Sequence, residues 1–268
     1  MVAPAPLRRR IGRRIRQFLR SLQWRPEYRR LQSIRGIGEG RRAFLVGNGP
    51  SLASMDVSRL DGEFVCVVNM GIRAVGEGLS HADMHVVTDS NRYARFANEI
   101  ETIVLRSNVP YRFITRRGRH VWRGLRKQAD APFWVTMNTA KLRERNELPP
   151  LSDGVVTGPS VLISAAVLLE FLGFSPIYVI GCDLDYEAEA QYFYPMGQLD
   201  RVHEADPTVI ARRPGMDGVD AHFAVLREAF ARKGAKILNA GLGGNLVSLP
   251  RVSFDSLFPS AAPGNGTP

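Results

Sequence analysis

The chain has 268 residues, a formal net charge of +10 and 44% hydrophobic residues. This length suits one sizeable α/β domain, or one domain with an added subdomain, and no apolar run approaches the roughly 20 residues of a membrane-spanning helix. Arginines interrupt the amino terminus where a secretory signal would be apolar. Cys66 and Cys182 lie inside apolar runs, so we expect buried free thiols in a reducing, cytoplasmic compartment.

The positive charge is concentrated at the amino terminus. Residues 1–42 contain 13 arginines and two acidic residues, whereas the remainder has 23 basic and 24 acidic residues. Between the arginines, apolar residues recur at helical spacing: Leu7, Ile11, Ile15, Phe18, Leu19 and Leu22. The pattern predicts a basic amphipathic helix within an N-terminal arm, residues 1–40. Residues 7–23 could bind an anionic membrane surface, or pack on the domain or on a partner. Binding to nucleic acid ranks last, because the rest of the chain has no surplus of basic residues.

Residues 41–258 form the predicted nucleotide-binding or transferase domain. Short apolar runs predict strands, in chain order, at 43–46, 64–68, 84–87, 102–105, 112–115, 133–136, 177–180 and 236–238. Helices are expected near 90–100, 160–173 and 219–233. Uniformly apolar strands alternating with helices predict an α/β, Rossmann-like fold, a mostly parallel sheet with helices on both faces. Residues 187–218 lack clear periodicity and are interpreted as a lid-like segment, and the tail 259–268 as disordered.

Small and polar residues follow several predicted strands, where open α/β sheets bind ligands. They are Gly47, Asn48, Gly49, Pro50, Ser51, Asn69, Asp89, Gly181, Cys182 and Asp183. The turn 47–51 combines two glycines with a proline suited to a helix start, so we expect its exposed amides to bind phosphate. A tight strand–helix turn without a ligand is the alternative.

A second turn of this type precedes the helix expected near 160–173. It consists of Thr157, Gly158, Pro159 and Ser160. Such a helix start can face an anion or sugar hydroxyls, although ordinary capping explains it equally well.

The candidate acids and bases have similar alternatives. Asp183 and Asp185 could bind a divalent cation, orient a sugar hydroxyl or be solvated acids of a turn. His203 and His222 are candidate acid–base groups or ordinary surface histidines. The basic stretch 112–127 is interpreted as a solvated helix face, with binding of an acidic acceptor as the alternative.

Three segments resemble a bacterial family that acts in lipopolysaccharide and capsule synthesis: Arg42–Leu52, Thr157–Tyr186 and Gly234–Phe258. Two characterised groups share this pattern. One is the small bacterial sialyltransferases, which use CMP-sialic acid without a metal. The other is the MptE-like 6-hydroxymethylpterin diphosphokinase domain, which uses ATP and magnesium. The resemblance covers roughly residues 41–258.

The resemblance implies roles for individual residues. Asn48 and Asn69 match asparagines that contact the donor nucleotide or its phosphate, and the turns 157–160 and 181–183 would line the same nucleotide site. Tyr186 and Tyr192 resemble a tyrosine pair that helps the donor phosphate leave.

The sequence departs from the sialyltransferase pattern at the catalytic base. Asp217 stands where that family has a histidine, and His222 follows about a turn later. In the diphosphokinase interpretation, Asp89, Asp183 and Asp185 would hold magnesium.

The resemblance thus predicts a glycosyltransferase-like enzyme that uses a CMP-type nucleotide sugar in cell-surface polysaccharide or lipopolysaccharide biosynthesis. Its acceptor would be a glycan or a lipid-linked glycan, and it would act in the cytoplasm or on the inner face of the membrane. The alternatives are a magnesium-dependent diphosphokinase and a non-catalytic, nucleotide-binding membrane adaptor.

Overall fold

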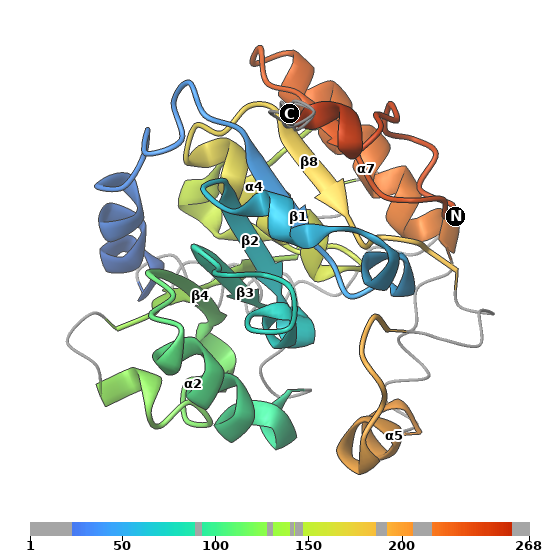
Figure 1. Cartoon of the computed structure of the whole chain (residues 1–268). Coiled ribbons are helices and arrows are strands. Elements are labelled where there is room, and N and C mark those ends of the chain that lie inside the picture. The colour runs from blue at the N-terminus through green and yellow to red at the C-terminus, as the bar shows by residue number, and fades with distance from the viewer. Residues whose placement is uncertain are drawn as a thin grey trace, which may run out of the picture.

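The computed structural model describes residues 23–88, 93–127, 131–139, 142, 147–185, 192–205 and 216–258. Its centre is a seven-stranded sheet with the order β5-β4-β3-β2-β1-β8-β9, in which every neighbouring pair is parallel (Figure 1). The strands are β1 (Ala43–Val46), β2 (Phe64–Val68), β3 (Met84–Val87), β4 (Tyr111–Thr115), β5 (Phe133–Val135), β8 (Ile177–Ile180) and β9 (Ile237–Asn239). The predicted Rossmann-like α/β fold is confirmed.

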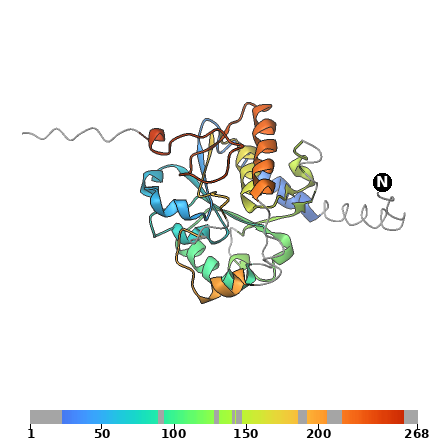
Figure 2. The same ribbon diagram turned by 90° about the vertical axis from the view of Figure 1, so that its right-hand side faces the viewer.

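Both faces of the sheet are covered because alternate residues of each strand point to opposite sides. Leu45 packs in a cluster with α4 (Val161–Phe171) and α7 (Met216–Ala231), whereas Phe44 packs in a second cluster with η3 (Asn69–Ala74) and α2 (Ala97–Arg106). Figures 1 and 2 show these two layers.

The remaining elements are short. They are η1 (Pro50–Ser54), η2 (Val57–Leu60), η4 (Ala94–Phe96), η5 (Arg116–Gly118), η6 (Leu125–Lys127), η7 (Leu151–Asp153), η8 (Asp255–Leu257) and α5 (Gln198–Glu204). A second, two-stranded parallel sheet joins β6 (Met137–Asn138) to β7 (Val155–Val156).

Two sequence-based expectations about these elements are wrong. The strand expected at 102–105 lies inside α2, whose buried residues Ala97, Ile100, Glu101 and Val104 recur at helical spacing. The helix face expected at 112–127 is instead β4 followed by η5 and η6. Residues 112–115 are extended as part of β4. Gly118 and Gly124 then disfavour a continuous helix, because glycine is a poor helix former.

Part of the segment assigned to the N-terminal arm packs on the domain. Residues 23–32 are helical, and Trp24 and Leu31 are completely buried. The indole Nε1 of Trp24 donates to the main-chain oxygen of Leu151 at 2.8 Å. The packed domain therefore begins before residue 41, because these apolar side chains complete the core under α4.

Residues 1–22, which carry most of the predicted amphipathic helix, and the predicted tail 259–268 lie outside the described residues. Among the helices that the structure describes, none is both long and apolar enough to cross a membrane.

Candidate functional site

The sheet changes direction of winding between β1 and β8. The chain continues from β1 to β2 on one side, whereas β8 lies on the other side of β1, and such a switch point opens a crevice at the carboxyl ends of the strands. The predicted turns that follow these two strands meet there. Gly47 N donates to Ile180 O at 2.9 Å, and Gly49 N donates to Gly181 O at 2.8 Å. A Cβ on Gly47 would lie 2.2 Å from Gly181 O, so only glycine fits.

The carboxylate of Asp183 binds the turn 47–51. Its Oδ2 accepts a hydrogen bond from Ser51 N at 2.8 Å, and its Oδ1 accepts one from the Ser51 hydroxyl. The expectation that the amides of this turn face a phosphate is therefore wrong for Gly47, Gly49 and Ser51, whose amides have acceptors inside the protein. Pro50 begins the helix as expected, but that helix is η1, a 3-10 helix of five residues.

Two asparagines beside this switch point have unsatisfied side-chain oxygens. Asn48 Oδ1 and Asn69 Oδ1 are buried and lack a hydrogen-bond partner. Asn48 lies against η3, since a Cβ on Gly71 would come within 2.7 Å of its Oδ1. Leaving a buried acceptor unpaired costs about 1–3 kcal/mol. This cost marks a place where a ligand that supplies hydrogen-bond donors would be stabilised.

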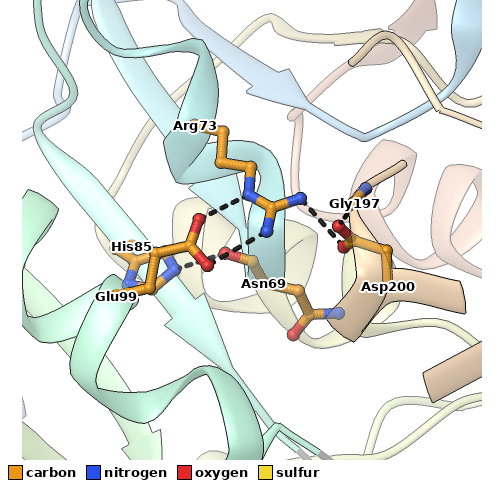
Figure 3. A network of polar contacts seen from close by, with 6 residues as sticks. All are labelled: Asn69, Arg73, His85, Glu99, Gly197 and Asp200. Atoms are coloured by element: carbon orange, nitrogen blue, oxygen red, sulfur yellow. Dashed lines mark hydrogen bonds and ion pairs between the residues drawn. The ribbon is translucent and has the colours of Figure 1, made fainter. Parts of the chain in front are cut away.

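His85 holds the main chain of Asn69. Asn69 adopts the left-handed conformation, with φ of 47°, and its main-chain oxygen accepts a hydrogen bond from His85 Nε2 at 2.9 Å (Figure 3). Burial lowers the pKa of His85 to about 4, so the imidazole is neutral and carries its proton on Nε2. This role of His85 was not predicted from the sequence. The available signal was a histidine inside an apolar strand whose neighbouring strand ends at Asn69.

The described part of the predicted lid, residues 192–205, is attached to this edge of the sheet (Figure 3). Arg73 on η3 donates from Nη1 to Asp200 Oδ1 at 2.9 Å, and from Nε and Nη2 to the two oxygens of Glu99 at 2.6 and 3.0 Å. Asp200 Oδ2 also accepts a hydrogen bond from Gly197 N at 3.0 Å. Phe193 N donates to Asn48 O at 3.2 Å, so the segment reaches the end of β1 as well.

The tyrosines of this segment form a stacked pair. The rings of Tyr192 and Tyr194 are parallel with centroids 5.2 Å apart, and the Tyr192 hydroxyl donates to Glu204 Oε1 at 2.6 Å. Burial raises the pKa of both phenols, so both remain protonated donors at neutral pH. The guanidinium of Arg73 lies 4.5 Å from the ring centroid of Tyr194. Tyr186, the other member of the pair implied by the resemblance, lies outside the described residues.

The turn 157–160 leads into α4 at the same edge of the sheet, because a helix that precedes a parallel strand runs opposite to it. Ser160 is the N-cap, and its side chain accepts a hydrogen bond from Leu162 N at 3.3 Å. Thr157 N donates to Asn138 O at 3.0 Å, which ties the turn to the small sheet. The N-terminus of this 11-residue helix adds a partial positive charge near the crevice.

The candidate bases lie on α7. His222 Nδ1 hydrogen-bonds to the main-chain oxygen of Gly218, which leaves Nε2 as the acceptor nitrogen. Asp217 lies in the first turn of α7, and its side chain is outside the described part of the structure. His203 lies on the buried side of α5, and its ring centroid is 5.3 Å from those of Tyr93, in a tilted contact, and Phe96, in an edge-to-face contact.

A glycine-rich turn after β9 also reaches this region, and it was not predicted from the sequence to be part of the site. Asn245 N donates to Asp183 O at 2.7 Å, and a Cβ on Gly244 would lie 2.6 Å from the same oxygen. Asp220 on α7 fixes the end of the turn by accepting from Val247 N and Ser248 N at 2.9 and 2.8 Å. Three glycines directly after a strand were the signal for it.

The proposed magnesium ligands are not brought together in the described structure. Asp183 binds Ser51, Asp185 is exposed, and Asp89 lies outside the described residues. Within the described part of the chain, no group of three or more His, Cys, Asp or Glu side chains could hold a metal ion. Cys66 and Cys182 are buried and unpaired, and burial raises the pKa of both thiols.

No protein-family model matches the sequence, and no curated protein matches it either. Among solved structures, the chain is similar to the MAf glycosyltransferase from Magnetospirillum magneticum AMB-1, with a TM-score of 0.51 and 14% sequence identity. The match covers 82% of this chain and 35% of that enzyme, so the chain spans about a third of its length. At this identity the similarity shows a shared fold.

Proposed function

We propose that the chain is a glycosyltransferase-like enzyme that uses a nucleotide-activated sugar of the CMP type. The observation that carries this proposal is the pair of buried, unpartnered oxygens of Asn48 and Asn69 beside the β1–β8 switch point. The fold shared with a glycosyltransferase and the resemblance to small sialyltransferases support it.

The amide groups suit a nucleotide. An amide oxygen accepts from a ribose hydroxyl or a base amino group, and an amide nitrogen donates to a phosphate oxygen. Because Asp183 is a carboxylate bound to Ser51, like-charge repulsion disfavours phosphate at that point of the turn. The phosphate would instead lie toward the N-terminus of α4, where the helix dipole favours negative charge.

The reaction transfers the sugar from the nucleotide to an acceptor hydroxyl. His222 would accept the hydroxyl proton on Nε2, since its Nδ1 is bonded to Gly218, and Asp217 is the alternative base. The acceptor oxygen then bonds to the anomeric carbon as the bond to the nucleotide phosphate breaks. A protonated phenol such as Tyr192 would stabilise the departing phosphate, after exchanging its bond to Glu204.

The resemblance and the basic arm motivate the rest of the proposal. The acceptor would be a glycan or a lipid-linked glycan of surface-polysaccharide assembly, on the inner face of the membrane. In the proposed reaction no metal takes part, because phenol and amide groups would stabilise the leaving phosphate by donating hydrogen bonds to it.

A thermal-shift screen against CMP, UDP, GDP and ATP, with and without magnesium, tests the proposal. Ligands that bind only the folded state raise its melting temperature. We expect CMP or UDP to raise it without magnesium and the Asn48→Ala variant to lose the shift. Asn98→Ala, on the exposed side of α2, is the matched control.

Other outcomes select other functions. A shift that requires ATP and magnesium would indicate the diphosphokinase. Nucleotide binding without turnover of any nucleotide sugar would indicate a non-catalytic adaptor.

A further inference from the structure

A basic surface follows β4 at the same edge of the sheet as the candidate site. Residues 116–127 contain no acidic residue, and in Figure 1 their light-green turns lie beside α2. Six basic side chains of this segment are exposed: Arg117, Arg119, His120, Arg123, Arg126 and Lys127. We refer to these six as the 116–127 surface.

The backbone under this surface is fixed. Trp122 and Leu125 are completely buried. The carboxylate of Glu101 on α2, 8% exposed, accepts hydrogen bonds from Gly124 N at 3.1 Å and Leu125 N at 3.0 Å. This carboxylate of α2 thus binds the backbone of the segment rather than its basic side chains.

A second acid of the described residues, Glu27, also pairs outside the six exposed side chains. The Glu27 carboxylate lies 3.7 Å from guanidinium nitrogens of Arg30 and Arg116. Neither arginine is one of the six exposed side chains that define the 116–127 surface. Within the described part of the chain, no ion pair neutralises the six exposed side chains. Concentrated charge of one sign attracts anions and raises their rate of association.

The kinds of side chain exposed on this surface limit the classes of ligand that it can bind. Insertion into a membrane needs exposed apolar side chains, and binding of single-stranded nucleic acid uses aromatic rings on which bases stack. Here Trp122 and Leu125 are buried, and the exposed groups are cationic. Such a surface suits a hydrophilic chain that carries negative charges.

We infer that the 116–127 surface binds an acidic acceptor glycan, one with phosphate or carboxylate groups along its chain. The role as acceptor rests on the glycosyltransferase activity proposed above, whereas binding of the acidic glycan does not. The surface follows β4, and Arg119 lies over the ring of Trp134 on β5, so an acceptor that extends along the sheet edge from there passes β3 and β2 before it reaches β1 and the nucleotide.

The test compares a fluorescein-labelled carboxylated oligosaccharide, an oligogalacturonate of about eight sugars, with a neutral malto-oligosaccharide of equal length, by fluorescence anisotropy. We expect only the acidic chain to bind, and more weakly at about 0.15 M than at about 0.03 M salt. The double variant Arg117→Glu/Arg123→Glu should weaken its binding about tenfold or more.

The matched control is Arg232→Glu/Lys236→Glu, which makes the same charge change on two exposed residues near the amino end of β9. We expect it to retain affinity within about twofold. Unchanged binding by the Arg117→Glu/Arg123→Glu variant, or equal binding of the neutral chain, would overturn the inference.

Two further arms distinguish other ligands and the two proposals. In the first arm, vesicles of phosphatidylcholine and phosphatidylglycerol or a single-stranded oligonucleotide replace the glycan. If the Arg117→Glu/Arg123→Glu variant loses binding to one of these ligands but not to the acidic glycan, the inference fails. A CMP or UDP thermal shift that persists while the acidic chain does not bind defeats this inference alone. Charge-dependent glycan binding by a protein that binds no nucleotide sustains the glycan site and defeats the proposed function.

Discussion

Asp183 connects the ends of β1 and β8 through Ser51, and it also belongs to the motif that suggested a metal ligand or a nucleotide contact. Hydrogen bonds to a charged group are stronger than neutral ones, so this carboxylate contributes to stability whatever else it does. The two roles make different predictions.

Replacement of Asp183 by alanine should lower the free energy of unfolding by about 1–3 kcal/mol, because Ser51 loses its acceptor. Urea denaturation measures this change. Asp183→Asn keeps an acceptor oxygen and should lose less. Loss of magnesium-dependent activity without a change in stability would instead favour the metal role.

His85 gives the fold a predictable dependence on pH. Its pKa is lowered to about 4 in the folded protein by burial, whereas an unfolded histidine titrates near 6.5. Above pH 6.5 both states are neutral, and between 6.5 and 4 only the unfolded state binds the proton. The stability that this group contributes is therefore present above pH 6.5 and is lost as the pH falls toward 4.

We expect the free energy of unfolding to fall by about 1.4 kcal/mol for each pH unit below 6.5, to a total of about 3 kcal/mol at pH 4. The His85→Gln variant should lack this component and should still donate to Asn69. The exposed His120, changed to Gln, is the control and should keep the wild-type slope. Equal slopes for wild type and His85→Gln would contradict the assignment.

Among the elements, α5 has the reverse of the usual amphipathic arrangement. Asp200 and His203 are 5% and 3% exposed, whereas Leu199 and Val202 are 52% and 55% exposed. Its polar face points inward because Asp200 pairs with Arg73. Removing Arg73 would leave the buried carboxylate of Asp200 without its ion-pair partner, so the packing of α5 on the domain depends on Arg73.

The Arg73→Met variant should therefore detach residues 192–205. Hydrogen exchange of the α5 amides should become at least about tenfold faster, because local opening is facilitated. Arg42→Met provides the matched control, since Arg42 also pairs with a glutamate, Glu63, but at the amino end of β1. Unchanged α5 exchange in Arg73→Met would show that the pair does not hold the segment.

At the scale of the whole molecule, the basic arm and the domain meet near residue 23. Trp24 is part of the core, so a deletion that tests the arm should end at residue 22. Deletion of residues 1–22 should abolish co-sedimentation with anionic vesicles and leave the melting temperature of the domain within a few degrees. Retained vesicle binding would refute the proposed role of the arm.

Much of the fold could be predicted from the sequence, because buried parallel strands are apolar throughout and are easily distinguished. The runs at β1, β2, β3 and β8 have the bounds that the pattern predicts. The error at 102–105 arose because a short apolar run is compatible with a strand or with the buried side of a helix.

That the turns after these strands lie at one edge of the sheet could also be predicted from the sequence, since the carboxyl ends of parallel strands point the same way. What it could not provide was their partners. Ser51 faces Asp183 across 132 residues, and Arg73 faces Asp200 across 127. These pairings depend on how distant segments pack, and no local pattern encodes them.

The sequence by itself determined an α/β chain with glycine turns after its central strands, because burial and turn geometry are local properties of residues. The tertiary structure was needed to show that the amides of Gly47, Gly49 and Ser51 have acceptors inside the protein and that the side-chain oxygens of Asn48 and Asn69 are buried without a partner. It also placed α5 with its polar face inward. A hydrogen bond needs both of its partners in place, and only folding brings them together.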